Sequence, residues 1–178
     1  MRIISGELGG RKIDPPGKMP HTRPTTDIAK GGLFNILQHQ LDFGNLKTLD
    51  LFGGTGAISL ELASRGVTDL TIVEKDPSMA SFISATAAQL GISGLKVVRM
   101  DVFAFLRGAP GTFDFVFAGP PYALGNIDDL PGLVLPLLNA GGLFVLEHTP
   151  RNSYKGFDGY AQERSYGTTV FTFFINRT

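Results

Sequence analysis

The chain has 178 residues, 43% of them hydrophobic, which suits one domain able to bury about two thirds of its unfolded surface. It has no cysteine, which excludes disulfides and thiolate metal sites, and with only His21, His39 and His148 as possible imidazole ligands we expect no metal. Sixteen basic residues balance sixteen acidic ones, and no signal peptide or run of about 18 apolar residues is evident, so we expect a cytoplasmic protein without membrane spans.

The first 30 residues carry most of the charge asymmetry. They hold six Lys or Arg against three acids, a net charge of +3, which leaves −3 on the rest of the chain. Residues 1–24 predict a small β-hairpin arm that turns at Gly9-Gly10. A basic arm on an acidic body suits contact with a polyanion, although a solvated hairpin with scattered charge gives the same pattern.

A helix is predicted after Pro24, capped by Thr25 or Thr26. Its apolar side chains repeat at helical spacing and indicate core packing: Leu33, Phe34, Leu37 and Leu41.

From Lys47 onward, short apolar runs typical of strands alternate with segments of helical length. Strands are expected at 47–52, 70–74, 95–100, 113–118 and 142–148, with helices at 57–66, 77–90, 101–106 and 127–138. This alternation predicts a parallel sheet with right-handed crossovers. The segments 160–167 and 168–175 leave no room for a helix around Gly167 and predict a closing antiparallel hairpin. The expected fold is a Rossmann-like α/β sheet over residues 25–178, unlike a dehydrogenase, whose second half would repeat the first.

A glycine-rich turn follows the first of these strands. Gly53, Gly54 and Gly56 allow a ligand to approach the backbone, and Phe52 lies inside the same turn. An ordinary tight strand-to-helix connection would look similar. A dinucleotide fingerprint would require a further glycine at Ser59.

Three carboxylates stand at or just after three successive strand ends, where an adenosine ligand would need them. Asp50 suits an ammonium group, Glu74 suits two ribose hydroxyls, and Asp101 suits an adenine amine, with the Val102 N–H facing the ring. Each acid alone could be a helix cap or a solvated loop charge, but three together favour a nucleoside site.

The sequence Gly-Pro-Pro-Tyr at 119–122 follows the fourth strand, and further motifs run almost from end to end. They are Arg2-Ile3-Ile4-Ser5-Gly6, Gly10-Arg11-Lys12, Arg23-Pro24-Thr25-Thr26-Asp27, Leu33-Phe34-Asn35-Ile36-Leu37, DLFGGTGAISLELASRG at 50–66, Val73-Glu74-Lys75-Asp76, Phe113-Asp114, Pro120-Pro121-Tyr122 and Tyr166-Gly167. With these motifs the chain resembles the RsmD family of 16S ribosomal RNA guanine-N2 methyltransferases, which are class I enzymes with a seven-stranded sheet.

The resemblance implies transfer of a methyl group from S-adenosylmethionine, leaving S-adenosylhomocysteine, to the N2 amine of a guanine in 16S rRNA. The partner would be an assembling or assembled small ribosomal subunit, and the protein a monomer. The implied cofactor residues are Asp50, Phe52, Gly53, Gly54, Gly56, Glu74, Lys75, Asp101 and Val102. The implied RNA contacts are Arg2, Arg11, Lys12 and Arg23.

In the family motif, Asp-Pro-Pro-Tyr or Phe, the aspartate and the first proline carbonyl accept the amine N–H bonds, and the aromatic ring stacks on the base. Here the turn reads Gly119, Pro120, Pro121 and Tyr122, so one acceptor is missing. Loss of a charge-assisted hydrogen bond costs about 1.5 to 3 kcal/mol, roughly a 10- to 150-fold slower reaction. Further departures are Ile28, where a basic residue is usual, and Gly31-Gly32, each glycine costing a helix about 1 kcal/mol.

Other functions stay open at this point. Because the motif aspartate is Gly119 here, one alternative is a non-catalytic assembly factor that binds S-adenosylmethionine and rRNA. Another is a methyltransferase that acts on a different nucleic-acid amine or on a small molecule. Ser59 and the terminal hairpin disfavour a nucleotide-dependent oxidoreductase. We interpret His148 as a loop histidine rather than as a base, because N-methylation can release its proton to water.

Overall fold

The computed structural model describes residues 1–17 and 24–178, so Arg23 lies outside the described residues. The seven strands are β1 (Lys47–Leu51), β2 (Asp69–Val73), β3 (Leu95–Val98), β4 (Phe113–Ala118), β5 (Leu138–His148), β6 (Tyr160–Tyr166) and β7 (Thr169–Ile175). The α-helices are α1 (Asp27–Leu37), α2 (Ala57–Ser64), α3 (Pro77–Gln89), α4 (Val102–Arg107) and α5 (Leu130–Val134). None of the helices in these described ranges is long and apolar enough to cross a membrane.

The strands form one sheet in the order β3-β2-β1-β4-β5-β7-β6. Strands β1 to β5 are parallel, and β7 pairs antiparallel with both β5 and β6. Gly167 turns the β6–β7 hairpin with a φ of 63°. The predicted five parallel strands and closing hairpin are therefore confirmed. The strand order reverses between β1 and β4, where open α/β sheets form a ligand crevice at the carboxyl ends of the strands.

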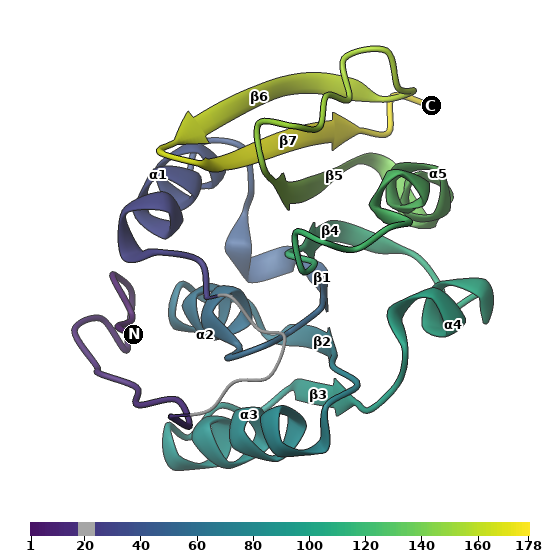
Figure 1. The fold of residues 1–178 in the computed structure, drawn as a ribbon. Coiled ribbons are helices and arrows are strands. Elements are labelled where there is room, and N and C mark those ends of the chain that lie inside the picture. Colours follow the sequence, from purple (N-terminus) through teal and green to yellow (C-terminus); the bar gives the residue numbers. More distant parts are fainter. Residues whose placement is uncertain (18–23) are drawn as a thin grey trace.

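Helices cover both faces of the sheet, with α1, α2 and α3 on one side and α4 and α5 on the other (Figure 1). Successive strand residues point to opposite faces, so each strand contributes to two cores. In β5, Phe144 and Leu146 pack on the α4–α5 side, while Leu143 and Val145 pack on the α1–α2 side. Because helices cover both faces of the sheet, apolar side chains are favoured at nearly every position of these strands.

The expected helix over 127–138 is broken into three short pieces. Two 3₁₀ turns, Ile127–Asp129 and Leu135–Leu137, flank α5, and β5 begins at Leu138. Pro136 has no N–H to donate and its ring disfavours a continuing α-helix. Apolar spacing alone did not reveal this interruption.

Helix α1 confirms the predicted helix and selects between its two candidate caps. The Thr26 side chain accepts a hydrogen bond from the Ala29 N–H, whereas Thr25 points elsewhere. At Gly32 a Cβ atom would collide with the ring of Tyr166, but at Gly31 it would only touch the end of Ile4. Close packing against the β6–β7 hairpin therefore accounts for one of the two helical glycines.

The expected N-terminal hairpin is reduced to one bridge, between Arg2 and Lys12. The Ile3 and Ile13 N–H groups donate to the Arg11 and Met1 carbonyls on either side of this bridge, and both side chains are buried against Leu60 of α2. The buried carboxylate of Glu61 accepts the N–H groups of Ile4 and Ser5, at 2.8 and 3.1 Å. The arm lies beside α2 and α3 (Figure 1), and this packing and the bonds to Glu61 hold it there.

Candidate active site

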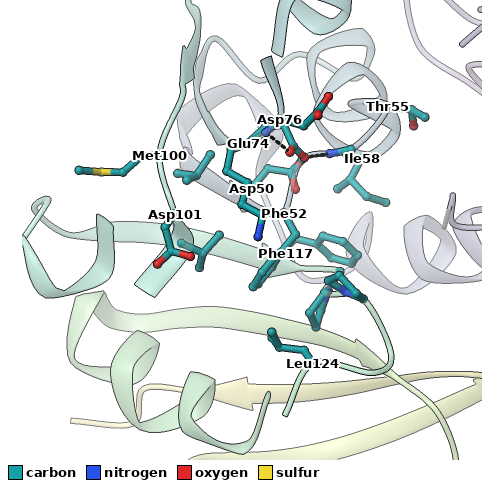
Figure 2. Close-up of a pocket in the computed structure, with 18 of the residues that line it drawn as sticks. Asp50, Phe52, Thr55, Ile58, Glu74, Asp76, Met100, Asp101, Phe117 and Leu124 are labelled. Carbon is teal, nitrogen blue, oxygen red and sulfur yellow. Dashed lines mark hydrogen bonds between the residues drawn. The ribbon is translucent and has the colours of Figure 1, made fainter. Parts of the chain in front are cut away.

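A cavity of about 860 Å³ opens at the carboxyl ends of the parallel strands, where the strand order reverses. Its walls come from the β1–α2 turn, the ends of β2 and β3, the turn after β4, and residues before α1. Figure 2 shows Asp50, Glu74 and Asp101 around this hollow, together with Phe52, Phe117 and Leu124. The three carboxylates predicted from successive strand ends thus line one cavity.

The turn between β1 and α2 needs its glycines for two different reasons. A Cβ at Gly53 would collide with Cγ2 of Ile72. Gly54 and Gly56 have φ angles of 58° and 79°, where side chains are disfavoured. Gly56 does not line the cavity but serves as the N-cap of α2. Phe52, with φ at 60°, holds a left-handed conformation that is unusual for an aromatic residue and marks local strain beside the cavity.

Glu74 fixes the shape of that turn. One carboxylate oxygen accepts the Gly54 N–H at 2.8 Å, and the other accepts the Asp76 N–H at 2.8 Å, as the dashed lines in Figure 2 mark. The side chain is buried at the end of β2. A carboxylate can accept up to about four hydrogen bonds, so these two bonds are compatible with the predicted contact to ribose hydroxyls.

Asp50 is buried in the cavity wall and is held by Ser59 of α2, whose hydroxyl donates to Oδ2 at 2.8 Å. Burial raises the pKa of Asp50 to about 7, the bonds from Ser59 oppose this rise, and the charge of Glu74 adds to it. A cationic ligand beside Asp50 would favour its charged form. Ser59, noted in the sequence only as a missing glycine, is therefore a site residue.

The third carboxylate, Asp101, also has a structural role. Its Oδ2 accepts the Ala104 N–H at 3.0 Å and caps α4, while the side chain remains exposed at the cavity edge. Lys75 is exposed at the same edge, whereas the Val102 side chain is buried in the core. Both the capping and the ligand interpretation of Asp101 are thus compatible with its position.

The turn after β4 forms the other side of the cavity. Gly119, Pro120 and Pro121 line it, and the Gly119 N–H donates to the Leu51 carbonyl at 3.3 Å. Tyr122 is half-buried and does not line the cavity, and its hydroxyl donates to Glu147 Oε2 at 2.9 Å.

Glu147 was missed in the sequence, where Thr25 had been noted only as a candidate cap and as part of the motif at 23–27. The Thr25 hydroxyl donates to Glu147 Oε1 at 2.6 Å across 122 residues of chain. Glu147 is the only acid within the last apolar parallel strand and is buried, a signal that could have singled it out. Thr25 could not have been paired with it without the fold.

His148 is part of β5 and fully buried, which corrects its interpretation as a loop histidine. Its Nδ1 donates to the Thr149 carbonyl at 2.8 Å, and its Nε2 accepts from the Thr172 hydroxyl at 2.6 Å. Burial lowers its pKa, so the ring is neutral at pH 7. It does not line the cavity, and within residues 1–17 and 24–178 no cluster of acids and histidines could hold a metal ion.

The predicted RNA contacts Arg2, Arg11 and Lys12 are exposed on the arm. Arg2 and Lys12 form the bridge of the arm, so their side chains leave on the same face.

Known proteins with similar sequences or structures include ribosomal RNA methyltransferases. The chain is 32% identical to Ribosomal RNA small subunit methyltransferase D of Escherichia coli K12 over 134 residues, which are 75% of this chain and 66% of that protein. A solved structure of a hypothetical protein from Thermus thermophilus superposes with a TM-score of 0.84 at 31% identity, covering 98% of each chain. A 16S rRNA N2 G1207 methyltransferase from T. thermophilus, solved with AdoMet and guanosine, shares the fold at 22% identity and a TM-score of 0.74, covering 99% of this chain and 49% of that one.

The chain thus spans slightly less than two thirds of the length of the E. coli relative. The family model described as Conserved hypothetical protein 95 matches residues 1–175. The chain therefore belongs to this family, the RsmD family that its sequence motifs indicated.

Proposed function

We propose that the protein transfers a methyl group from S-adenosylmethionine to the exocyclic N2 amine of a guanine in 16S ribosomal RNA. The observation that carries this proposal is the cavity, in which three strand-end carboxylates face the Gly119-Pro120-Pro121 turn. One side of the cavity suits a charged nucleoside cofactor, and the other suits a flat base with an amine.

The residues of the first three strand ends fit S-adenosylmethionine, which supplies an electrophilic methyl group when bound. Asp50 would attract the ammonium group, Glu74 would accept from the ribose hydroxyls, and Asp101 with the Val102 N–H would contact the adenine. Lys75 lies at the edge of the cavity. The glycine turn leaves room for the cofactor to approach the backbone.

On the acceptor side, catalysis would depend chiefly on positioning. Alignment of a weak nitrogen nucleophile with the methyl group can supply on the order of 7 to 11 kcal/mol. The fixed φ of Pro120, together with the restriction that Pro121 places on its ψ, would hold its carbonyl toward the amine. A stacked aromatic ring is worth about 1 to 3 kcal/mol per base, and Tyr122 would provide it only after turning into the cavity, which it does not line in this structure.

The arm would bring the RNA to this cavity. Arg2, Arg11 and Lys12 would contact phosphates, with Arg23 as a further contact outside the described residues. The arm at residues 1–24 would serve RNA binding and residues 25–178 catalysis, and the partner would be an assembling or assembled small subunit.

Incubation with labelled S-adenosylmethionine and small ribosomal subunits that lack the modification tests this function. We expect label in the 16S rRNA and none in large subunits. Binding of both ligands without transfer above background would instead support the assembly-factor alternative.

A further inference from the structure

The turn that borders the acceptor side contains no acidic side chain, yet a buried carboxylate stands directly behind it. We propose that Glu147 is the carboxylate acceptor for the target amine, in place of the side chain that Gly119 lacks. This inference rests on the proposed function.

The sheet register brings the two residues together. Ala118 pairs with Leu146 in the parallel β4–β5 ladder, so Gly119 and Glu147 are the next residues along their strands. A Cβ built on Gly119 would lie 3.7 Å from Glu147 Oε1. A side chain at this position would therefore point toward the space that the glutamate already occupies.

Two hydroxyl groups hold the carboxylate in this position. Thr25 donates to Oε1 at 2.6 Å, and Tyr122 donates to Oε2 at 2.9 Å. Glu147 is only 4% exposed, and a carboxylate in a site of low dielectric interacts more strongly with a donor than one in water. Glu147 does not itself line the cavity, but Thr25, which donates to it, and Gly119, whose Cβ position lies next to it, are both lining residues.

The chemistry of the reaction gives this carboxylate a use. The amine nitrogen forms a bond to the methyl carbon while the carbon–sulfur bond breaks and its electron pair stays on sulfur. The nitrogen then carries a positive charge and releases one proton to water. A hydrogen bond from the amine N–H to Glu147 would keep electron density on nitrogen and would stabilise its developing charge.

Moving the carboxylate between the two positions tests the proposal. We expect Glu147→Gln to slow single-turnover methylation of 16S rRNA roughly 10- to 150-fold, with unchanged binding of S-adenosylhomocysteine. Adding Gly119→Asp to this variant should restore most of the rate. The matched control adds Gly119→Ala, which introduces the same Cβ, 3.1 Å from Phe117 Cε1, without a carboxylate. A rate for Glu147→Gln within about twofold of wild type, or equal rates in the two double variants, would overturn the proposal.

A binding measurement gives a second readout. Guanosine and inosine differ only in the 2-amine, so their relative affinity for the protein loaded with S-adenosylhomocysteine reports the amine contact. We expect wild type to prefer guanosine and Glu147→Gln to lose this preference. A preference retained by Glu147→Gln contradicts the role of Glu147 alone, whereas a wild-type protein that methylates no guanine contradicts the proposed function.

Discussion

The two sides of the cavity are built in different ways. On the cofactor side, Glu74 and Asp101 bind backbone N–H groups of neighbouring segments, so the side chains proposed for the ligand also shape the turns that receive it. On the acceptor side, Glu147 is held by Thr25 and Tyr122, which are distant in the chain. The cofactor side is thus held by contacts within one strand–helix–strand unit, and the acceptor side by how the residues before α1 and the turn after β4 meet β5.

The largest effect that we expect from this difference is at Glu74. Glu74→Ala leaves the Gly54 and Asp76 N–H groups without their acceptor, at a cost of about 1 to 3 kcal/mol each where they stay buried. Binding of S-adenosylhomocysteine, measured by titration calorimetry, should weaken by about 100-fold or more, because about 1.4 kcal/mol is a factor of ten. Glu74→Gln keeps one carbonyl acceptor in its side chain and should lose less affinity than Glu74→Ala. Equal losses of affinity in the two variants would show that the charge of Glu74, and not the geometry of the turn, matters.

The acceptor side depends on the position of α1. Alanine substitutions at Gly31 and at Gly32 test how closely this helix is packed. Gly32→Ala should destabilise the fold by about 1 to 3 kcal/mol, because its methyl group collides with the Tyr166 ring. Gly31→Ala makes only an ordinary contact with Ile4 and should stabilise the fold by about 0.5 to 1 kcal/mol through helix propensity. Urea unfolding of both variants measures the difference. Equal effects would contradict the close packing of α1 on the hairpin.

The cofactor side should respond to pH through Asp50. Burial raises its pKa to about 7, so the group is largely neutral at lower pH, and only its charged form attracts an ammonium group. Affinity for S-adenosylhomocysteine should therefore increase roughly tenfold from about pH 6 to about pH 8. Asp50→Asn should remove this dependence, and a wild-type affinity that is flat with pH would contradict the proposed contact.

The smallest effect should come from the arm, which lies outside the cavity. Reversing Arg11 and Lys12 to glutamate should weaken rRNA binding and reduce the slope of log affinity against log salt by up to about two, since each phosphate contact contributes about 0.7 to 0.9. Reversing Lys155 and Arg164, which are also exposed, provides the control. Unchanged RNA binding in the arm variant would refute its RNA role.

Sequence patterns were sufficient for the features that depend on neighbours in the chain. Strand alternation, the β6–β7 hairpin and the strand-end position of Asp50, Glu74 and Asp101 follow from local spacing, and the structure confirms these positions. The arm was only partly predicted, because its pairing is limited to the Arg2–Lys12 bridge, beyond which the Ile4 and Ser5 N–H groups donate to Glu61 of α2.

Features that need contacts between distant segments were missed. The apolar pattern around Glu147 indicated a strand, but not that Thr25 and Tyr122 would meet its carboxylate. The sequence also did not show that Gly32 leaves room for the ring of Tyr166. Both contacts follow from tertiary packing, which spacing along the chain does not encode.

Nucleoside analysis of 16S rRNA tests the central claim most directly. Small subunits from cells that lack this protein would be incubated with the protein and S-adenosylmethionine, and the digested RNA examined by mass spectrometry. The account predicts that N2-methylguanosine appears, and that the Asp50→Asn and Glu147→Gln variants form it more slowly. No new methylated nucleoside, or methylation of a different base, would contradict it.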